Sequence, residues 1–226
     1  VAADLGYTEE FNHRFWRDFR TRVKKANPDA LILAEHYGDP KAWLLGDQWD
    51  TVMNYDAFME PITWFLTGVE KHSDEFRGDL LGNPDAFTGA LRHHMSRFNQ
   101  NSLEIAMNEL SNHDHSRFLT RTNRRVGRIH TMGPEAAGEN INKGVFREAV
   151  VSQMTWPGAP TIYYGDEAGL CGWTDPDNRR GYPWGREDQE LIQFHRDIIK
   201  VHKDSAALMK GSVMFLHGEY KVVSYG

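Results

Sequence analysis

The sequence has 226 residues, of which 40% are hydrophobic and 26% charged, and its formal net charge at pH 7 is -6. This composition is typical of a globular chain with one sizeable core, and it lacks the basic stripe that a nucleic-acid partner requires. No apolar run approaches the roughly 20 residues of a membrane-spanning helix, and the single cysteine, Cys171, excludes an internal disulfide framework. We therefore expect neither a nucleic acid nor a membrane as a partner.

Helix-like and strand-like segments alternate along the chain. Apolar residues recur every four positions from Phe11 to Val23, which predicts a helix over residues 9–26. The short apolar run over 30–34 lacks polar alternation, which predicts a strand buried on both faces, as in a parallel sheet. Three further short strands are expected over 49–53, 103–108 and 161–164. A short helix is expected to start at 38–40, and further helices are expected over 56–68, 85–98, 143–156 and 186–205.

Two β-like runs follow the last predicted helix, at 212–217 and 220–225. The repeated strand–helix alternation predicts an α/β fold with a parallel sheet, and the closing pair predicts that an all-β domain begins there. We therefore divide the chain into 1–206 and 207–226. The alternation by itself is compatible with both a barrel and a doubly wound open sheet.

Polar residues stand repeatedly at the carboxyl ends of the predicted strands. In (β/α)8 barrels, active sites are built at this end of the strands. The pattern therefore favours a barrel with one shared site. The strand-end residues are Glu35 and His36, Asn54 and Tyr55, the run Asn112-His113-Asp114, and Asp166 with Glu167.

Glu35 closes the apolar run Ala30-Leu31-Ile32-Leu33-Ala34. A carboxyl group at such a strand end is partly desolvated, and desolvation favours its protonated form. A general acid that protonates a leaving sugar oxygen requires this property. A charged residue that merely ends a strand beside a loop fits the same pattern, so Glu35 alone leaves both interpretations open.

The run His113-Asp114-His115 places two imidazoles beside a carboxylate. Adjacent residues on a loop rarely converge on one metal ion, and no second histidine cluster has zinc-like spacing. His93 and His94 are neighbours on a predicted helix and point in different directions. We therefore expect no metal site, and an imidazole beside a carboxylate better suits hydrogen bonding to sugar hydroxyls.

Two later segments add a family resemblance to these strand-end residues. They are Pro157-Gly158-Ala159-Pro160-Thr161-Ile162-Tyr163-Tyr164-Gly165-Asp166-Glu167 and Asp175-Pro176-Asp177-Asn178-Arg179. Together with Glu35 and Asn112-His113-Asp114, they resemble the α-amylase family of glycoside hydrolases, nearest its cyclomaltodextrinase, neopullulanase and α-glucosidase branches. The resemblance runs from Val1 to about residue 207. It implies the C-terminal half of a TIM-type (β/α)8 barrel, about strands 5–8, followed by the start of a C-terminal all-β domain.

The resemblance implies roles for three residues. Glu35 matches the general acid/base, Asp114 matches the carboxylate that stabilises the transition state, and His113 matches the imidazole that also holds the sugar. The family's nucleophile is an Asp in a Gly-x-Arg-x-Asp-Val-Ala pattern, and Val1-Ala2 matches the end of that pattern. The nucleophile is therefore expected immediately before Val1, and this chain alone is expected to be inactive.

Further residues are expected to contact the substrate without reacting with it. Arg179 suits a sugar subsite, although bracing a loop fits it equally. Trp184 lies in the loop after the last predicted strand and can stack on glucose. His36 stands where many relatives carry an aromatic residue, so it alters the wall of the site. The full set of expected substrate-binding residues is His113, Arg179, Asn54, Tyr55, His36 and Trp184.

The implied reaction is a retaining one, in which a carboxylate attacks the anomeric carbon while an acid protonates the leaving oxygen. No cofactor is expected. The family sometimes binds structural calcium, and Asp175, Asp177 and Asn178 form the most ligand-like oxygen cluster. A turn rich in Asx and Pro accounts for the same residues, so we expect no calcium there.

The expected substrate is an α-glucan oligosaccharide or polysaccharide, cleaved at α-1,4 or α-1,6 bonds. Two alternatives stay open: a non-catalytic glucan-binding module, and a transferase or isomerase of the same family. Half a barrel exposes strand edges, which invite pairing with another chain. We therefore expect either a homodimer or the missing N-terminal half of the barrel as a partner, and the compartment is left open.

Overall fold

The computed structural model describes residues 2–226; Val1, which the family resemblance assigns to the nucleophile pattern, lies outside the described residues. The helices are α1 (Glu9–Ala26), α2 (Glu60–Thr67), α3 (Pro84–Met95), α4 (Gln100–Glu104), α5 (Phe118–Arg121), α6 (Ile129–Met132), α7 (Lys143–Thr155), α8 (Gln189–Asp204) and α9 (Ala206–Lys210). The strands are β1 (Leu33–Ala34), β2 (Thr51–Val52), β3 (Met107–Glu109), β4 (Ala159–Thr161), β5 (Phe215–Glu219) and β6 (Val222–Tyr225). Short 3-10 helices cover Lys41–Trp43, Glu135–Gly138 and Asp177–Arg179, and a π-helical turn covers Tyr55–Met59.

The long helices begin and end at the residues that local chemistry favours. The Thr8 hydroxyl accepts the Phe11 N–H at the start of α1, and the Asn142 side chain accepts the Val145 N–H at the start of α7. Gly68 ends α2 with a φ of 70°, a left-handed conformation that glycine adopts without strain. The helices predicted over 9–26, 85–98, 143–156 and 186–205 are confirmed as α1, α3, α7 and α8, with small shifts at their ends.

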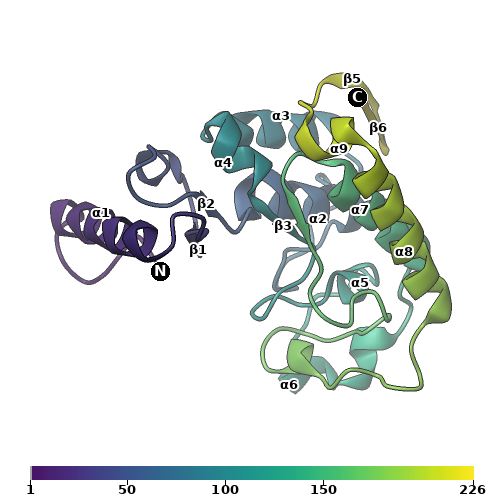
Figure 1. The fold of residues 1–226 in the computed structure, drawn as a ribbon. Coiled ribbons are helices and arrows are strands. Elements are labelled where there is room, and N and C mark those ends of the chain that lie inside the picture. Colours follow the sequence, from purple (N-terminus) through teal and green to yellow (C-terminus); the bar gives the residue numbers. More distant parts are fainter. Residues whose placement is uncertain (1) are drawn as a thin grey trace.

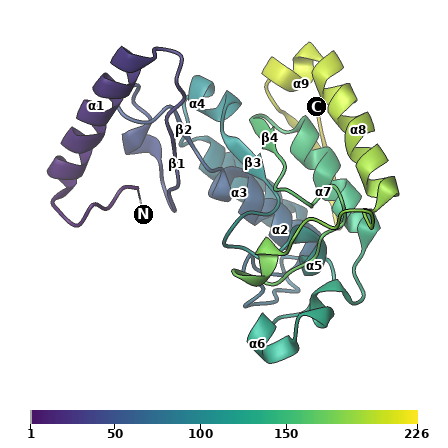
Figure 2. The same cartoon turned by 60° about the horizontal axis from the view of Figure 1, so that its bottom comes forward.

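The first four strands run parallel and lie side by side in chain order. Leu33 pairs with Thr51 between β1 and β2, and Met107 pairs with Ala159 between β3 and β4. An isolated parallel bridge from Met53 to Met107 joins the two pairs. Helical segments connect the successive strands, as Figures 1 and 2 show. The predicted α/β order with parallel strands is therefore confirmed.

Two predicted strands are displaced. Residues 100–104 form α4, because the Asn99 side chain accepts the Ser102 N–H and caps a helix there, so β3 begins only at Met107. The prediction of a strand over 103–108 was therefore wrong in its first half. The fourth strand ends at Thr161 rather than at Tyr164. Tyr163 and Tyr164 instead lie against the guanidinium group of Arg117, at 4.1 and 4.8 Å from their ring centres.

The main hydrophobic core lies where α2, α3, α5, α7 and α8 meet. Phe58, Phe118, Phe146 and Leu191 are among its fully buried members. A second cluster, which includes Trp43 and Trp49, packs beside α1 at the other end of the molecule (Figure 2).

The antiparallel hairpin of β5 and β6 packs on the main core. Phe215, Val223 and Tyr225 contact the main cluster, and the Tyr225 ring lies 5.2 Å from that of Trp156. The β pair expected after the last helix is therefore present. The boundary at 206/207 between two domains stays a prediction.

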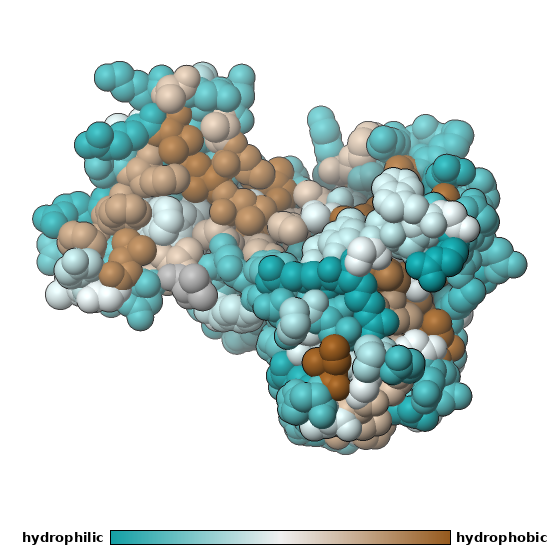
Figure 3. Space-filling view, turned by 90° about the horizontal axis from the view of Figure 1, so that it is seen from below, coloured by the Kyte–Doolittle hydropathy of each residue, from teal (hydrophilic) through white to brown (hydrophobic). Residues whose placement is uncertain are grey.

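The outer surface is apolar over part of the N-terminal region, as the brown area of Figure 3 shows. Exposed apolar side chains of this region include Phe15, Phe19, Leu31 and Leu33. Among the described residues, no helix combines the length and the apolar character needed to cross a membrane.

Candidate active site

The candidate site lies at the carboxyl ends of β1, β2 and β3. Glu35 directly follows β1, Tyr55 is the third residue after the end of β2, and the run from Asn112 to Asp114 follows β3. Because the three strands are parallel neighbours, their carboxyl ends lie at the same edge. Residues that are far apart in the sequence therefore meet there.

Glu35, His113 and Asp114 form one cluster. The His113 Nε2 atom lies 3.7 Å from Glu35 Oε1 and 3.5 Å from Asp114 Oδ1, so the imidazole stands between the two carboxylates. The side chains of Glu35, His113 and Asp114 are 28%, 43% and 40% exposed, respectively. All three can therefore be reached by a ligand from solvent.

Arg179 completes the exposed side of the cluster. Its Nη2 lies 4.0 Å from Asp114 Oδ1, and its Nε donates to the His113 carbonyl oxygen at 3.1 Å. The same Nε also lies 2.8 Å from Asp175 Oδ1. Arg179 therefore holds the loop that carries His113 and Asp114, while part of its guanidinium group stays open to solvent.

The loop itself is held by the Asn112 side chain. Asn112 Oδ1 accepts the backbone N–H groups of Asp114 and His115, at 3.0 and 2.9 Å. Asn178, in turn, donates from Nδ2 to the carbonyl oxygens of Asn112 and His115. These bonds fix the position of the Asp114 carboxylate with respect to β3.

Tyr55 is buried directly behind Glu35. Its hydroxyl donates to Glu35 Oε1 at 3.3 Å, and its ring stacks on that of Tyr37 with centres 4.7 Å apart. Burial, together with the nearby carboxyl group of Glu109, raises the pKa of Tyr55. Tyr55 therefore stays protonated and acts on Glu35 as a hydrogen-bond donor, rather than as part of a cleft wall.

Sequence reasoning missed a further carboxyl group, that of Glu109 at the end of β3. Its residue is only 1% exposed, and its Oε1 accepts from Asn112 Nδ2 at 2.7 Å. Burial raises the pKa of Glu109 to about 8, and Glu35 and Asp166 raise it as well, whereas Asn112 and Arg121 lower it. A carboxylate at the end of a predicted strand was the signal that could have identified it.

Three of the expected substrate-binding residues are not brought into this cluster. Asn54 is fully buried and donates to Asn108 Oδ1 at 2.7 Å, so it links two strands and does not line a cleft. His36 turns toward an aromatic group, with its ring 5.4 Å from that of Trp49, and burial lowers its pKa. Trp184 is 80% exposed, and its ring lies 4.4 Å from that of Tyr182.

Among the described residues, two groups of side chains have a spacing that could hold a metal ion. One is Glu35, His113 and Asp114, whose candidate ligand atoms lie within 4.8 Å of one another. The other is Glu70, His72 and Asp74, in which Glu70 already accepts from His72 and Asp74 pairs with Arg128. The side chains of the first group are partly exposed to solvent.

The oxygen cluster that was considered for calcium is engaged in protein contacts. Asp175 pairs with Arg179, and Asp177 pairs with Arg180 at 2.8 Å. Asp177 also accepts the backbone N–H of Trp173. These contacts brace the loop after β4.

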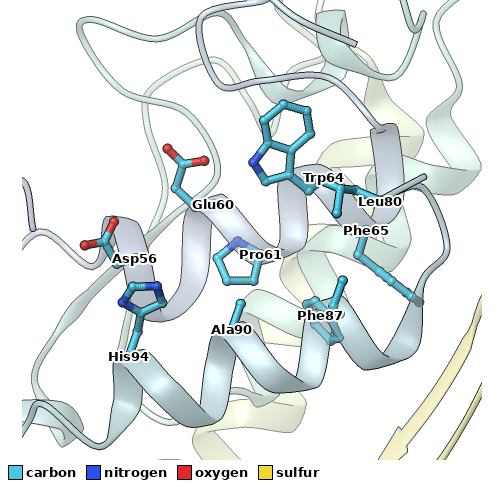
Figure 4. Close-up of a pocket in the computed structure, with 10 residues that line it drawn as sticks. Asp56, Glu60, Pro61, Trp64, Phe65, Leu80, Phe87, Ala90 and His94 are labelled. Atoms are coloured by element: carbon cyan, nitrogen blue, oxygen red, sulfur yellow. The ribbon is translucent and has the colours of Figure 1, made fainter. Parts of the chain in front are cut away.

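A separate pocket of about 300 Å³ lies between α2 and α3 (Figure 4). Asp56, Glu60 and Trp64 line one side of it, and Phe87 and His94 line the other. None of the candidate site residues lines this pocket, so it is distinct from the cluster around Glu35.

The chain is similar to known proteins over nearly all of its length. Residues 7–211 match the model of the α-amylase catalytic domain. The chain is 37% identical over 223 residues to neopullulanase 2 of Thermoactinomyces vulgaris, covering 98% of this chain and 33% of that protein. It is 33% identical over 223 residues to a cyclomaltodextrinase of Thermoanaerobacter pseudethanolicus, covering 98% of this chain and 34% of that protein.

Among solved structures, the chain is similar to a debranching enzyme of Nostoc punctiforme. The TM-score is 0.77 at 29% identity, over 93% of this chain and 41% of that structure. The chain thus spans about a third of the length of neopullulanase 2 and of the cyclomaltodextrinase.

Proposed function

Because the chain belongs to the α-amylase family, we propose that its parent protein is a retaining glycoside hydrolase. Its substrates are maltooligosaccharides, cyclodextrins or starch-derived glucans, cleaved at α-1,4 or α-1,6 glucosidic bonds. The observation that carries the proposal is the placement of His113 between Glu35 and Asp114, with all three side chains open to solvent. The names of the curated relatives, neopullulanase and cyclomaltodextrinase, support the same substrate class.

In this proposal, Glu35 is the general acid/base. It protonates the leaving glycosidic oxygen and then removes a proton from the incoming water. Asp114 and His113 hold sugar hydroxyls, and their hydrogen bonds strengthen as positive charge develops at the anomeric carbon. Arg179 keeps the Asp114 loop in place through its contacts with Asp114 and the His113 carbonyl.

The nucleophile is proposed to lie outside residues 1–226. The Ala2 N–H donates to the Glu35 carbonyl oxygen at 3.2 Å, and the Trp16 indole N–H donates to the Ala2 carbonyl at 2.8 Å. Ala2 thus lies at the end of β1. This placement supports a nucleophile close to Glu35, as a retaining pair separated by about 5–5.5 Å requires.

We further propose that residues 1–206 supply about strands 5–8 of a (β/α)8 barrel and that the C-terminal all-β domain begins near residue 207. Four parallel strands in chain order with helical connections support this assignment. The share of neopullulanase 2 and of the cyclomaltodextrinase that this chain spans, about a third, also supports a partial barrel.

The test is hydrolysis of p-nitrophenyl α-maltoside by the full-length parent and its Glu35→Gln variant. Loss of the acid/base is expected to lower kcat by about 10²–10⁴-fold, the typical contribution of a positioned general acid. Glu10→Gln, on the exposed first turn of α1, is the matched control and should retain activity.

Two results would contradict the proposal. One is a Glu35→Gln variant with the activity of the parent. The other is a folded parent that binds maltotriose without cleaving any α-glucan, which would identify a non-catalytic glucan-binding module. Analysis of the products with maltotriose as acceptor separates hydrolysis from transfer, since both use the same glycosyl-enzyme.

A further inference from the structure

A continuous row of hydrogen-bonded side chains lies behind Glu35 and ends at Glu109. We infer that Glu109 is a positioning residue, whose buried carboxyl group orients the Asn112 amide and, through it, the Tyr55 hydroxyl on the acid/base Glu35. The inference rests on the proposed function, which assigns Glu35 its role. It adds a residue that touches neither the sugar nor the reacting atoms.

The distances along this row are those of hydrogen bonds at every step. Asn112 Nδ2 lies 2.7 Å from Glu109 Oε1 and 3.2 Å from the Tyr55 hydroxyl oxygen. The Tyr55 hydroxyl lies 3.3 Å from Glu35 Oε1. Glu109, Asn112 and Tyr55 are all buried, so the contacts among these three residues are shielded from bulk water.

The Asn112 amide determines which groups in the row donate hydrogen bonds and which accept them. An Asn side chain has two N–H donors and an oxygen that accepts two bonds. Asn112 Oδ1 is used by the backbone N–H groups of Asp114 and His115. Its Nδ2 is used by Glu109 and Tyr55, so every hydrogen-bonding position of the amide is occupied. An amide flip would break all four bonds.

The direction continues through Tyr55. Because the Tyr55 oxygen accepts from Asn112, its own proton is free to donate. Its acceptors include Glu35 Oε1 at 3.3 Å and the Met53 sulfur at 3.4 Å, and the Tyr37 hydroxyl also interacts with it. A carboxylate oxygen is a much stronger acceptor than a thioether. The Tyr55 proton therefore points at Glu35, which fixes the carboxyl group that must reach the glycosidic oxygen.

The charge of Glu109 suits this arrangement. The carboxyl group of Glu109 interacts with Glu35, Asp166, Arg121 and the neutral Tyr55 phenol. Burial raises the pKa of Glu109 to about 8, so near pH 7 it is a neutral acid. It can then accept from Asn112 without adding a second negative charge behind Glu35.

The test uses the full-length parent with Glu109→Ala and Glu109→Gln. The alanine variant leaves an Asn112 N–H without a partner, and we expect kcat on p-nitrophenyl α-maltoside to fall by about 10–100-fold with little change in KM, as for a misplaced catalytic group. The glutamine variant keeps a neutral acceptor of the same shape, so kcat near pH 7 should stay close to that of the parent. Its activity should also persist above about pH 8, where Glu109 ionises in the parent.

A structural readout makes the test independent of activity. In a crystal structure of Glu109→Ala, the distance from the Tyr55 hydroxyl to Glu35 should exceed the 3.3 Å of the intact row. The matched control is Gln153→Ala, because buried Gln153 donates to the Asn108 and Thr161 carbonyl oxygens and not to the row behind Glu35. It should lower the melting temperature and leave the Tyr55–Glu35 contact in place.

Three outcomes would overturn the inference: an unmoved Tyr55 in Glu109→Ala, an unchanged kcat, or a loss of kcat that Gln153→Ala reproduces at equal loss of melting temperature. If the parent cleaves no α-glucan but Tyr55 moves as expected, the proposed function fails and the positioning of Tyr55 by Glu109 stands.

Discussion

At the scale of single residues, the polar groups of the site differ in how far they are exposed to solvent. His113, Asp114 and Arg179 are open to solvent, Glu35 is half-buried, and Glu109 lies in the interior. The outer groups can exchange water for sugar hydroxyls. The buried group instead sets the orientation of its neighbours, because an unpaired polar atom there costs about 1–3 kcal/mol.

Glu109 should make stability depend on pH. Its pKa is about 8 in the folded protein and 4.5 when unperturbed, so between these values the folded state holds a proton that the unfolded state has lost. Stability therefore falls as pH rises through this interval. In thermal melts of the parent, the melting temperature of Glu109→Gln minus that of the parent should increase from about pH 5 to about pH 8. A difference that is constant with pH would show that Glu109 is ionised in the folded protein.

Activity should fall when Arg179 is replaced by a residue that keeps the positive charge. Arg179→Lys loses the planar fork that reaches Asp114 and the His113 carbonyl together. We expect kcat/KM for p-nitrophenyl α-maltoside to fall by about tenfold, corresponding to the loss of one charged hydrogen bond. Arg14→Lys, on an exposed position of α1, is the control. Equal kinetics for both variants would limit Arg179 to a role outside the site.

At the scale of elements, helix α7 supports the strands that carry the site. Phe146 is fully buried in the main core, whereas Gln153 of the same helix bonds the carbonyl oxygens of Asn108 in β3 and Thr161 in β4. One helix thus contributes to the hydrophobic core and also holds β3 and β4 in register. Displacing α7 should therefore disturb both the core and the pairing of these two strands.

Phe146→Ala is expected to destabilise the parent by about 3–5 kcal/mol, the usual cost of a large cavity in a packed core. Val151→Ala, on the exposed side of α7, should cost less than about 1 kcal/mol. Urea unfolding of both variants measures the difference. Similar midpoints for the two variants would contradict the burial of Phe146.

At the scale of the whole molecule, the apolar surface of the N-terminal region is the main unexplained feature (Figure 3). Leu31, just before β1, and Leu33, in β1, are exposed. Among the described residues, the one strand that pairs with β1 is β2. A parallel strand with a free edge and exposed apolar side chains favours association. We propose that the rest of the barrel in the parent covers this surface.

Residues 1–226 produced alone should therefore self-associate and should not hydrolyse p-nitrophenyl α-maltoside. Leu31→Lys places a charge on the exposed surface and should reduce association, whereas Leu216→Lys, equally exposed on the β5–β6 hairpin, should not. Light scattering coupled to size-exclusion chromatography measures both. A monomer with a cooperative unfolding transition, in the unmodified segment, would refute this expectation.

The sequence by itself determined the order of the main elements and the chemical identity of the exposed site. Helix periodicity and capping are local properties, so α1, α7 and α8 follow from residues that are close in the chain. Parallel strands present their carboxyl ends at one edge, so the meeting of Glu35 with His113 and Asp114 also followed from the pattern.

Only the tertiary structure decided which polar residues face solvent and which face one another. Asn54 and Tyr55 are adjacent in the chain, yet one links two strands and the other donates to Glu35. Glu109 lies three residues from its partner Asn112, but its burial depends on elements packed from distant parts of the chain. Burial and hydrogen-bond partners are set by contacts between remote segments, and local sequence patterns carry no record of them.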